Sequence, residues 1–148
     1  KNKNFVVNDD ILSGLSGART YIIENGDLVI NKDINFSDNI AFVVRGGNIK
    51  IDKSVNTIDG TYITIKKDGI GGKFLGKGGS TTNRLLVNGS LYGNIDDLIS
   101  NRTYVKQNSF NQIDVGTIVS FGSALFRKTA PLLSSFIDEY LESEKVAK

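Results

Sequence analysis

The amino-acid sequence predicts a mainly β protein: a short parallel β-helix of about four coils, each of about 21 residues, with an N-terminal cap and a C-terminal amphipathic α-helix. The first observation behind this prediction is an internal repeat, in which residues 21–41 align with residues 42–62 without a gap. The second is a series of short segments rich in Ile and Val between polar turn residues, which is typical of strands. The third is a helical spacing of apolar residues near the C-terminus.

The repeat extends to individual positions. In the first two copies, residues of like kind pair at Tyr21/Phe42, Leu28/Ile49, Ile34/Val55, Gly26/Gly47, Lys32/Lys53, Asn35/Asn56 and Asp38/Asp59. The third and fourth copies place Ile65 under Val44, Ile70 under Ile49, Leu86 under Ile65 and Leu91 under Ile70, with Asn88-Gly89 near the glycine column. Coils stacked about 4.8 Å apart would fill the interior with aliphatic columns and let Asn35 and Asn56 form a ladder of side-chain amides.

A hairpin-based β fold is the alternative. Asn25-Gly26 and Asn88-Gly89 both suit type I′ turns, and residues 21–30 would then form one hairpin of a sandwich or meander. This alternative explains the glycine column equally well. It does not explain why polar residues such as Lys32 recur in the next copy, whereas stacked coils do.

We expect a single domain over residues 1–148. Its parts are an N-terminal cap (1–20), the β-helix coils (21–98), an irregular segment with a strand (99–128) and a C-terminal helix (129–148). A cap is expected because a stacked repeat must cover its first coil. In the terminal helix Pro131 suits the first position. The helix's apolar face is expected to cover the open end or the flank of the β-helix, and consists of Leu132, Leu133, Phe136, Ile137, Tyr140 and Leu141.

Composition excludes several classes of chemistry. The chain has no Cys, so it has no disulfide framework and no thiolate nucleophile. It also has no His, the commonest general base. We therefore predict no cofactor and no metal. Its first residue is not Met and it is rich in Asn, Gly and Ser, which predicts an extracytoplasmic protein, secreted or on the cell surface, with a signal or anchor removed upstream of Lys1. No apolar run is long enough to cross a membrane, so no membrane insertion is expected in this segment.

Charge is nearly balanced overall, with 18 Lys and Arg against 16 Asp and Glu, but basic residues dominate between Arg45 and Arg84. A positive face there would bind a polyanion. The candidate binding residues are Arg45, Lys50, Lys53, Lys66, Lys67, Lys73 and Lys77. The aromatic residues nearby are Tyr62 and Phe74, too few for a nucleic-acid stacking platform, so an acidic polysaccharide is favoured over DNA. A solvated basic face without a ligand is the plain alternative.

The sequence supports a catalytic function less well than a binding function. The glycine-rich stretch Gly69–Gly79 matches neither of the phosphate-binding glycine motifs and reads as a flexible surface loop. Asp38 and Asp59 would lie one above the other and attract a cation, but aspartate at such positions is also a common turn residue. Two carboxylates flanking a sugar are what glycoside hydrolysis needs, yet about four coils leave little length for a groove. We therefore expect no enzyme activity.

Residues 21–98 resemble short right-handed parallel β-helix proteins, such as the bactofilin-type polymer-forming scaffolds and bacterial surface proteins of this shape. The segments that carry the resemblance are 25–30, 46–51 and 88–95. The resemblance implies end-to-end polymerisation without nucleotide. Two features depart from the bactofilin pattern: the repeat is longer, and the segment Leu132–Leu141 is placed to block one end.

These observations predict a non-catalytic bacterial cell-surface or envelope module for assembly or adhesion. Its partners would be further copies of the chain or other surface proteins. One alternative is a binder of acidic polysaccharide or DNA through the basic face. The other is a glycan-active enzyme, a class of protein that β-helices often host.

Overall fold

The computed structural model describes residues 4–14, 17–35, 40–77, 83–105, 113–121 and 130–146. Within these ranges the protein is mainly β, with parallel sheets and a C-terminal helix. The elements are β1 (Phe5–Val7), α1 (Asp9–Gly14), β2 (Arg19–Glu24), β3 (Leu28–Ile30), β4 (Ile40–Arg45), β5 (Ile49–Asp52), β6 (Thr57–Ile65), β7 (Phe74–Lys77), β8 (Leu85–Tyr92), α2 (Asp96–Asn101), β9 (Thr103–Val105), β10 (Ile113–Val115), β11 (Thr117–Ser120) and α4 (Leu133–Val146). None of the described helices is long and apolar enough to span a membrane.

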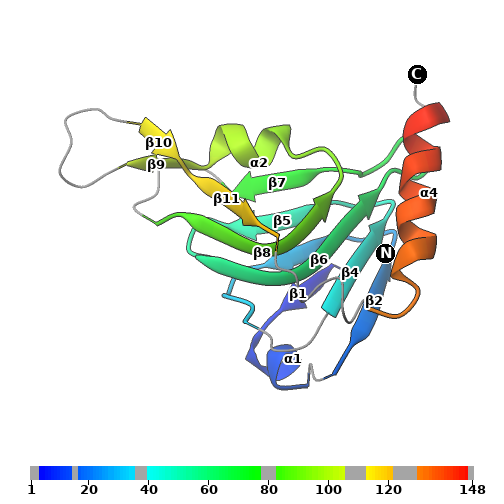
Figure 1. Cartoon of the computed structure of the whole chain (residues 1–148), viewed down its shortest axis with the longest axis horizontal. Coiled ribbons are helices and arrows are strands. Elements are labelled where there is room, and N and C mark those ends of the chain that lie inside the picture. Colours follow the sequence, from blue (N-terminus) through cyan, green and yellow to red (C-terminus); the bar gives the residue numbers. More distant parts are fainter. Residues whose placement is uncertain are drawn as a thin grey trace.

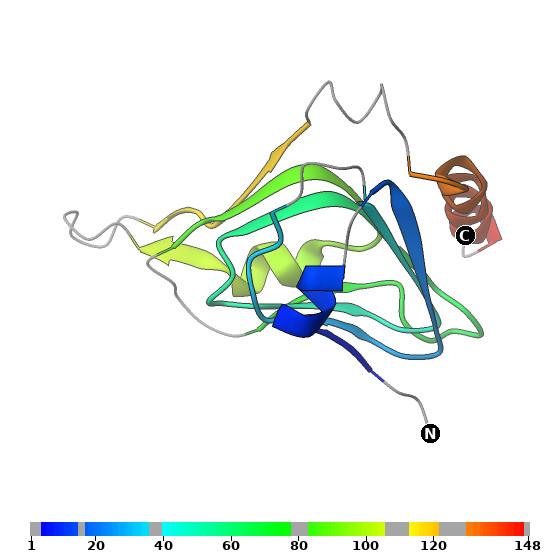
Figure 2. The same ribbon diagram turned by 90° about the horizontal axis from the view of Figure 1, so that it is seen from below.

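Two parallel sheets share one core. The five-stranded sheet has the order β11-β8-β6-β4-β2, and the four-stranded sheet has the order β1-β3-β5-β7. The chain alternates between them, because β2, β4 and β6 are followed by β3, β5 and β7 (Figures 1 and 2). The sheets do not close into one continuous ring. The hairpin alternative is wrong: the Asn25-Gly26 turn joins strands of different sheets, and Asn88-Gly89 lies inside β8.

The predicted register is confirmed for β2 with β4 and β3 with β5, and it is wrong from Ile34 onward, since Ile34 bridges Ile58 and not Val55. Tyr21 pairs with Phe42 and Leu28 pairs with Ile49, as the repeat predicts. After that, Val44 pairs with Thr64 instead of Ile65, and Ile49 pairs with Phe74 instead of Ile70. Leu86 and Leu91 pair with Thr57 and Tyr62 instead of Ile65 and Ile70.

The cause of the slip between β5 and β7 is a small loop between β6 and β7. Lys67 and Ile70 form an antiparallel bridge across a tight turn, in which Asp68 has a φ of 51° and Gly69 a φ of 78°. The turn places residues outside the sheet, so Ile70 is 63% exposed and Phe74 takes the core position. An insertion between two strands leaves each strand's own pattern intact, so the sequence alone does not reveal the shifted pairing.

The predicted asparagine ladder is also wrong. Ile34 bridges Ile58, so Asn35 does not lie opposite Asn56. Hydrogen bonds from Asp33 accompany the shifted pairing: its Oδ1 accepts the backbone N–H of Asn56 at 2.6 Å and that of Thr57 at 3.2 Å. The predicted partner of Asp59, Asp38, lies outside the described residues.

A different Asx ladder does run along the stack. The side-chain Oδ1 of Asn4 accepts the backbone N–H of Asp27, Asp27 accepts that of Asn48, and Asn48 accepts that of Lys73. The distances are 3.3, 2.8 and 3.2 Å. Each copy of the repeat therefore supplies an acceptor for the next one.

The core between the sheets contains an aromatic column. The rings of Tyr21, Phe42 and Tyr62 stack with centroid distances of 5.3 Å and 5.5 Å. The predicted glycine column is confirmed for Gly26 and Gly47 and continues at Gly71. A Cβ on Gly47 would lie 2.0 Å from the carbonyl oxygen of Gly26, so only glycine fits this close approach. Gly89 belongs instead to a second column, with Gly60.

Helices lie at both ends and on one flank of the stack. α1 lies at the lower end of the stack in Figure 1 and in front of it in Figure 2. Its Ile11 and Leu12 pack against the core. α2 lies beside β7, and its Leu98 is fully buried. α4 packs on the outer face of the five-stranded sheet, so β4 is buried on both faces. This explains the unbroken apolar run of β4.

The terminal helix covers the flank, which is one of the two predicted positions. It begins at Leu133, not at Pro131, because Leu132 has a φ of 63°, outside the helical region. Phe136, Ile137 and Tyr140 pack on the sheet as predicted. Leu132 and Leu141, predicted on the apolar face, are exposed.

Candidate functional site

The seven predicted polyanion-binding residues do not form one face. Arg45 and Lys67 lie at a corner near α4, and Lys50 and Lys77 lie in a groove on the four-stranded sheet. Lys66 and Lys73 line a separate hollow beside the glycine-rich turn. Lys53 is exposed in the turn between β5 and β6. The structure thus divides one predicted surface into distinct local environments.

The corner cluster holds α4 against the sheet. Arg45 Nη1 lies 2.7 Å from Glu24 Oε1, and Arg45 Nη2 lies 2.6 Å from Oε1 of Glu139, a residue of α4. These two carboxylates, Glu139 first, raise the pKa of the Arg45 guanidinium. Lys67 Nζ lies 3.5 Å from the other oxygen of Glu24. Both basic residues are therefore engaged by the protein's own carboxylates, which leaves little charge for a ligand.

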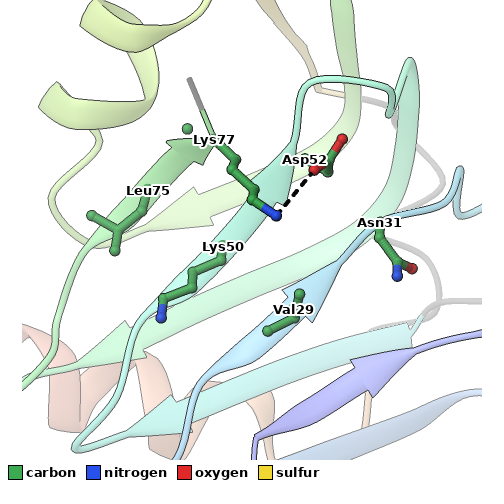
Figure 3. A pocket seen from close by; sticks show the side chains of 7 residues that line it. Val29, Asn31, Lys50, Asp52, Leu75 and Lys77 are labelled. Atoms are coloured by element: carbon green, nitrogen blue, oxygen red, sulfur yellow. Dashed lines mark ion pairs between the residues drawn. The ribbon is translucent and has the colours of Figure 1, made fainter. Parts of the chain in front are cut away.

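A groove of about 470 Å³ runs across the outer face of the four-stranded sheet (Figure 3). It crosses β3, β5 and β7, whose outward residues form two rows because strand residues alternate between faces. Val29, Lys50 and Leu75 share the first row. The rest of the lining is Asn31, Asp52, Gly76 and Lys77. The groove has an aliphatic floor with charges at its sides.

Charges in the groove are also matched. Lys50 Nζ lies 2.6 Å from Asp27 Oδ2, and Lys77 Nζ lies 3.7 Å from Asp52 Oδ2. Hydrogen bonds from the backbone N–H and hydroxyl of Ser54 to Asp52, at 3.0 and 2.9 Å, lower the pKa of this carboxyl together with Lys77. An anionic ligand here would have to compete with carboxylates that are already in place.

The hollow beside the glycine-rich turn is different. Its volume is about 480 Å³, and its lining is Asn48, Lys66, Gly69, Gly71, Gly72, Lys73 and Asn94. Among the described residues, neither Lys66 nor Lys73 has a carboxylate within ion-pair distance. Two predicted residues thus line a common cavity here without an acidic partner among the described residues.

Sequence reasoning missed a buried cation. Arg102, which follows α2, is 3% exposed. Its guanidinium donates to the backbone carbonyls of Asp52, at 3.0 Å, Lys53, at 3.3 Å, and Val55. Burial lowers the pKa of Arg102, although Asp52 and Asp33 oppose the shift. An Arg inside a polar stretch carries no sequence signal that separates it from a surface Arg.

The acidic side chains of the described ranges do not gather into a metal site. No group of three or more His, Cys, Asp and Glu side chains gathers there. Asp59 Oδ1 accepts a hydrogen bond from Asn88 Nδ2 at 2.8 Å, which is a structural contact between neighbouring strands.

The third surface feature is the edge strand β11. It pairs with β8 on one side, and no described strand pairs with its other side. Ile118 is 39% exposed, Val119 49% and Phe121, just beyond the strand, 54%. Val119 is in register with the buried Val87, so it continues the inner face of the sheet past the packed core.

The groove, the hollow and the edge strand are thus the features that a function could use. The chain matches no protein-family model, no curated protein and no solved structure. The groove, the hollow and the edge strand differ in charge and in polarity. The charges of the groove are compensated, those of the hollow are not, and the edge strand is apolar.

Proposed function

We propose that the chain is a non-catalytic β-helix module of about four coils that serves assembly or adhesion at a bacterial surface. The alternation of β2 to β8 between two parallel sheets supports a β-helix, because each copy of the repeat contributes one strand to each sheet. The glycine, aromatic and Asx columns along the stack support it further.

The observation that carries the assembly role is the exposed apolar edge of β11. Edge strands offer unpaired backbone N–H and C=O groups to another chain, and proteins usually protect them with charge or Pro. β11 (Thr117–Ser120) has neither, and Ile118 and Val119 are both well exposed. A strand from a second copy or a surface partner would extend the five-stranded sheet there and cover this apolar area.

The test is the mass of the full chain in solution by multi-angle light scattering, over a concentration series. We expect ordered oligomers that Ile118→Lys and Val119→Lys both reduce to monomers, because a charge on an edge opposes strand addition. Ile70→Lys is the matched control, since Ile70 is equally apolar and 63% exposed but lies in the glycine-rich turn. A chain that stays monomeric at all concentrations, or oligomers that the control variant also dissolves, would refute assembly through β11.

A further inference from the structure

The hollow beside the glycine-rich turn combines residues from three consecutive copies of the repeat. Asn48 precedes β5, Lys66 follows β6, Lys73 precedes β7, and Asn94 follows β8. Lys73 and Asn94 form a parallel bridge, and the backbone N–H of Asn94 donates to the carbonyl of Gly72 at 3.0 Å. The lining is therefore held by the sheet itself rather than by one free loop.

Both amide side chains in the hollow have their oxygen atoms occupied. Asn48 Oδ1 accepts the backbone N–H of Lys73 at 3.2 Å, and Asn94 Oδ1 accepts that of Asp96 at 3.0 Å. An asparagine amide whose oxygen is used presents its NH₂ group as a donor. The two Nδ2 atoms have no acceptor among the described residues.

The four side chains thus offer donors only: two ammonium groups and two amide NH₂ groups. No carboxylate lines the hollow; Asp68 lies at the tip of the turn but is not part of the lining. A concave site whose polar side chains carry positive charge and only donors is complementary to an anion. The groove on the four-stranded sheet lacks this property, because its Lys50 and Lys77 form ion pairs with Asp27 and Asp52.

Glycines give a bulky anion access to the site. Gly69, Gly71 and Gly72 line it with φ values of 78°, 79° and 84°, a region of backbone conformation that glycine adopts freely. Gly71 is further required because a Cβ there would lie 2.2 Å from the carbonyl oxygen of Gly47. Without side chains at these positions, a group with several oxygen atoms reaches both lysines and both amides.

We propose that this hollow binds a tetrahedral oxyanion, the sulfate or phosphate group of a larger acidic glycan. Four donors around one cavity suit a group with several acceptor oxygens better than a carboxylate with two. A volume of about 480 Å³ exceeds what a single oxyanion fills, which leaves room for the attached sugar. The proposal is independent of assembly through β11, because the two sites share no residue.

The test is a binding titration with dextran sulfate, in which neutral dextran is the reference polymer. Inorganic sulfate and inorganic phosphate are titrated separately. Binding is measured by calorimetry and by the shifts of the amide NMR signals of residues 66–73. We expect salt-sensitive binding of dextran sulfate and none of dextran. Lys66→Gln and Lys73→Gln should each weaken binding about tenfold, the usual loss for one charged hydrogen bond. Lys53→Gln removes the same charge outside the hollow and should change the affinity less than about twofold.

Asn94→Asp is the second variant. It retains the oxygen that accepts the Asp96 N–H but replaces the NH₂ donor with negative charge, so the fold is kept and binding should be lost. Free sulfate or phosphate shifting the same amide signals would identify the oxyanion as sufficient, whereas shifts with dextran sulfate alone would show that the sugar contributes; both outcomes support the site. Equal losses for Lys53→Gln and Lys66→Gln, or no binding of any probe, would overturn it.

Discussion

Replacing Arg102 with Ala removes a buried cation that ties the segment after α2 to the turn between β5 and β6. The guanidinium donates to three backbone carbonyls in that turn, those of Asp52, Lys53 and Val55. Two of these contacts are 3.0 and 3.3 Å long. Because this one side chain bonds to three carbonyls of the turn, its loss affects packing at a corner of the core.

The size of the effect follows from these contacts. A hydrogen bond to a charged group contributes about 1.5–3 kcal/mol net to the free energy of unfolding. If the charge were buried at no cost, the contributions of the three hydrogen bonds would add. Burial of the guanidinium offsets several kcal/mol of that sum. After truncation, water can reach the carbonyl of Lys53, an exposed residue, but not the fully buried Val55. We therefore expect Arg102→Ala to lower the free energy of unfolding by about 3 kcal/mol and the melting temperature by about 10 °C.

Urea unfolding, followed by circular dichroism, measures this loss. Arg19→Ala is the matched control, since Arg19 is exposed at the start of β2, and it should change stability by less than about 0.5 kcal/mol. Arg102→Lys should recover less than half of the loss, because one ammonium group cannot reproduce the planar fork of donors. An Arg102→Ala protein as stable as the Arg19→Ala protein would show that the guanidinium does not hold the turn.

Three further changes test other parts of the fold. Gly47→Ala should destabilise by about 3 kcal/mol or more, because its Cβ would lie 2.0 Å from the carbonyl oxygen of Gly26, whereas Gly14→Ala, with open space around the new Cβ, should not destabilise. A chain ending at Ala130 lacks α4 and should form larger particles than the full chain in light scattering, because the apolar outer face of β4 and β6 becomes exposed. Asp52→Asn should flatten the acid limb of the pH–stability curve. The pKa of Asp52 is lowered in the fold, so its stabilisation is complete above its ordinary value of 3.8 and is lost as the pH falls below that value.

Each of these expectations has a contrary result. Equal melting temperatures for Gly47→Ala and Gly14→Ala would show that the glycine column is not closely packed. A chain ending at Ala130 with the same particle mass as the full chain would show that α4 does not cover an apolar face. Parallel acid limbs for Asp52→Asn and the unaltered protein would show that Asp52 keeps its ordinary pKa.

The sequence predicts the parts of this fold that repeat. The alignment of Tyr21 with Phe42 and of Gly26 with Gly47 is enough to predict how β2 pairs with β4 and β3 with β5, because parallel stacking requires like residues in one column. The strand composition and the helical spacing of the tail predict the mainly β class and a C-terminal helix with one apolar face, but not which side of the stack it covers. These features depend on periodic burial, which a sequence displays directly.

The sequence does not predict where the repeat loses its register. The turn near Gly69 inserts residues between β6 and β7, and Asp33 accepts the backbone N–H of Asn56 where the pairing is shifted. Neither event leaves a trace in the hydrophobic pattern, since both concern backbone hydrogen bonds. The same limit applies to the candidate sites: seven basic residues lie close in sequence, but their ion pairs with Glu24, Asp27 and carboxylates elsewhere depend on the folded arrangement.

The proposed anion site lies where the structure departs from the repeat. A residue inside a column has partners above and below it, as Asp27 and Asn48 do, and its polar groups are used by the next copy of the repeat. The inserted turn interrupts this arrangement. Lys73 occupies the position after Asn48 in the Asx ladder, where it supplies a cation instead of another acceptor, and Lys66 lies across the same hollow. The inserted turn that hides the register in the sequence thus also forms the hollow whose polar side chains are all donors. In a fold built from repeats, a break in the repeat is therefore the first place to look for a ligand site.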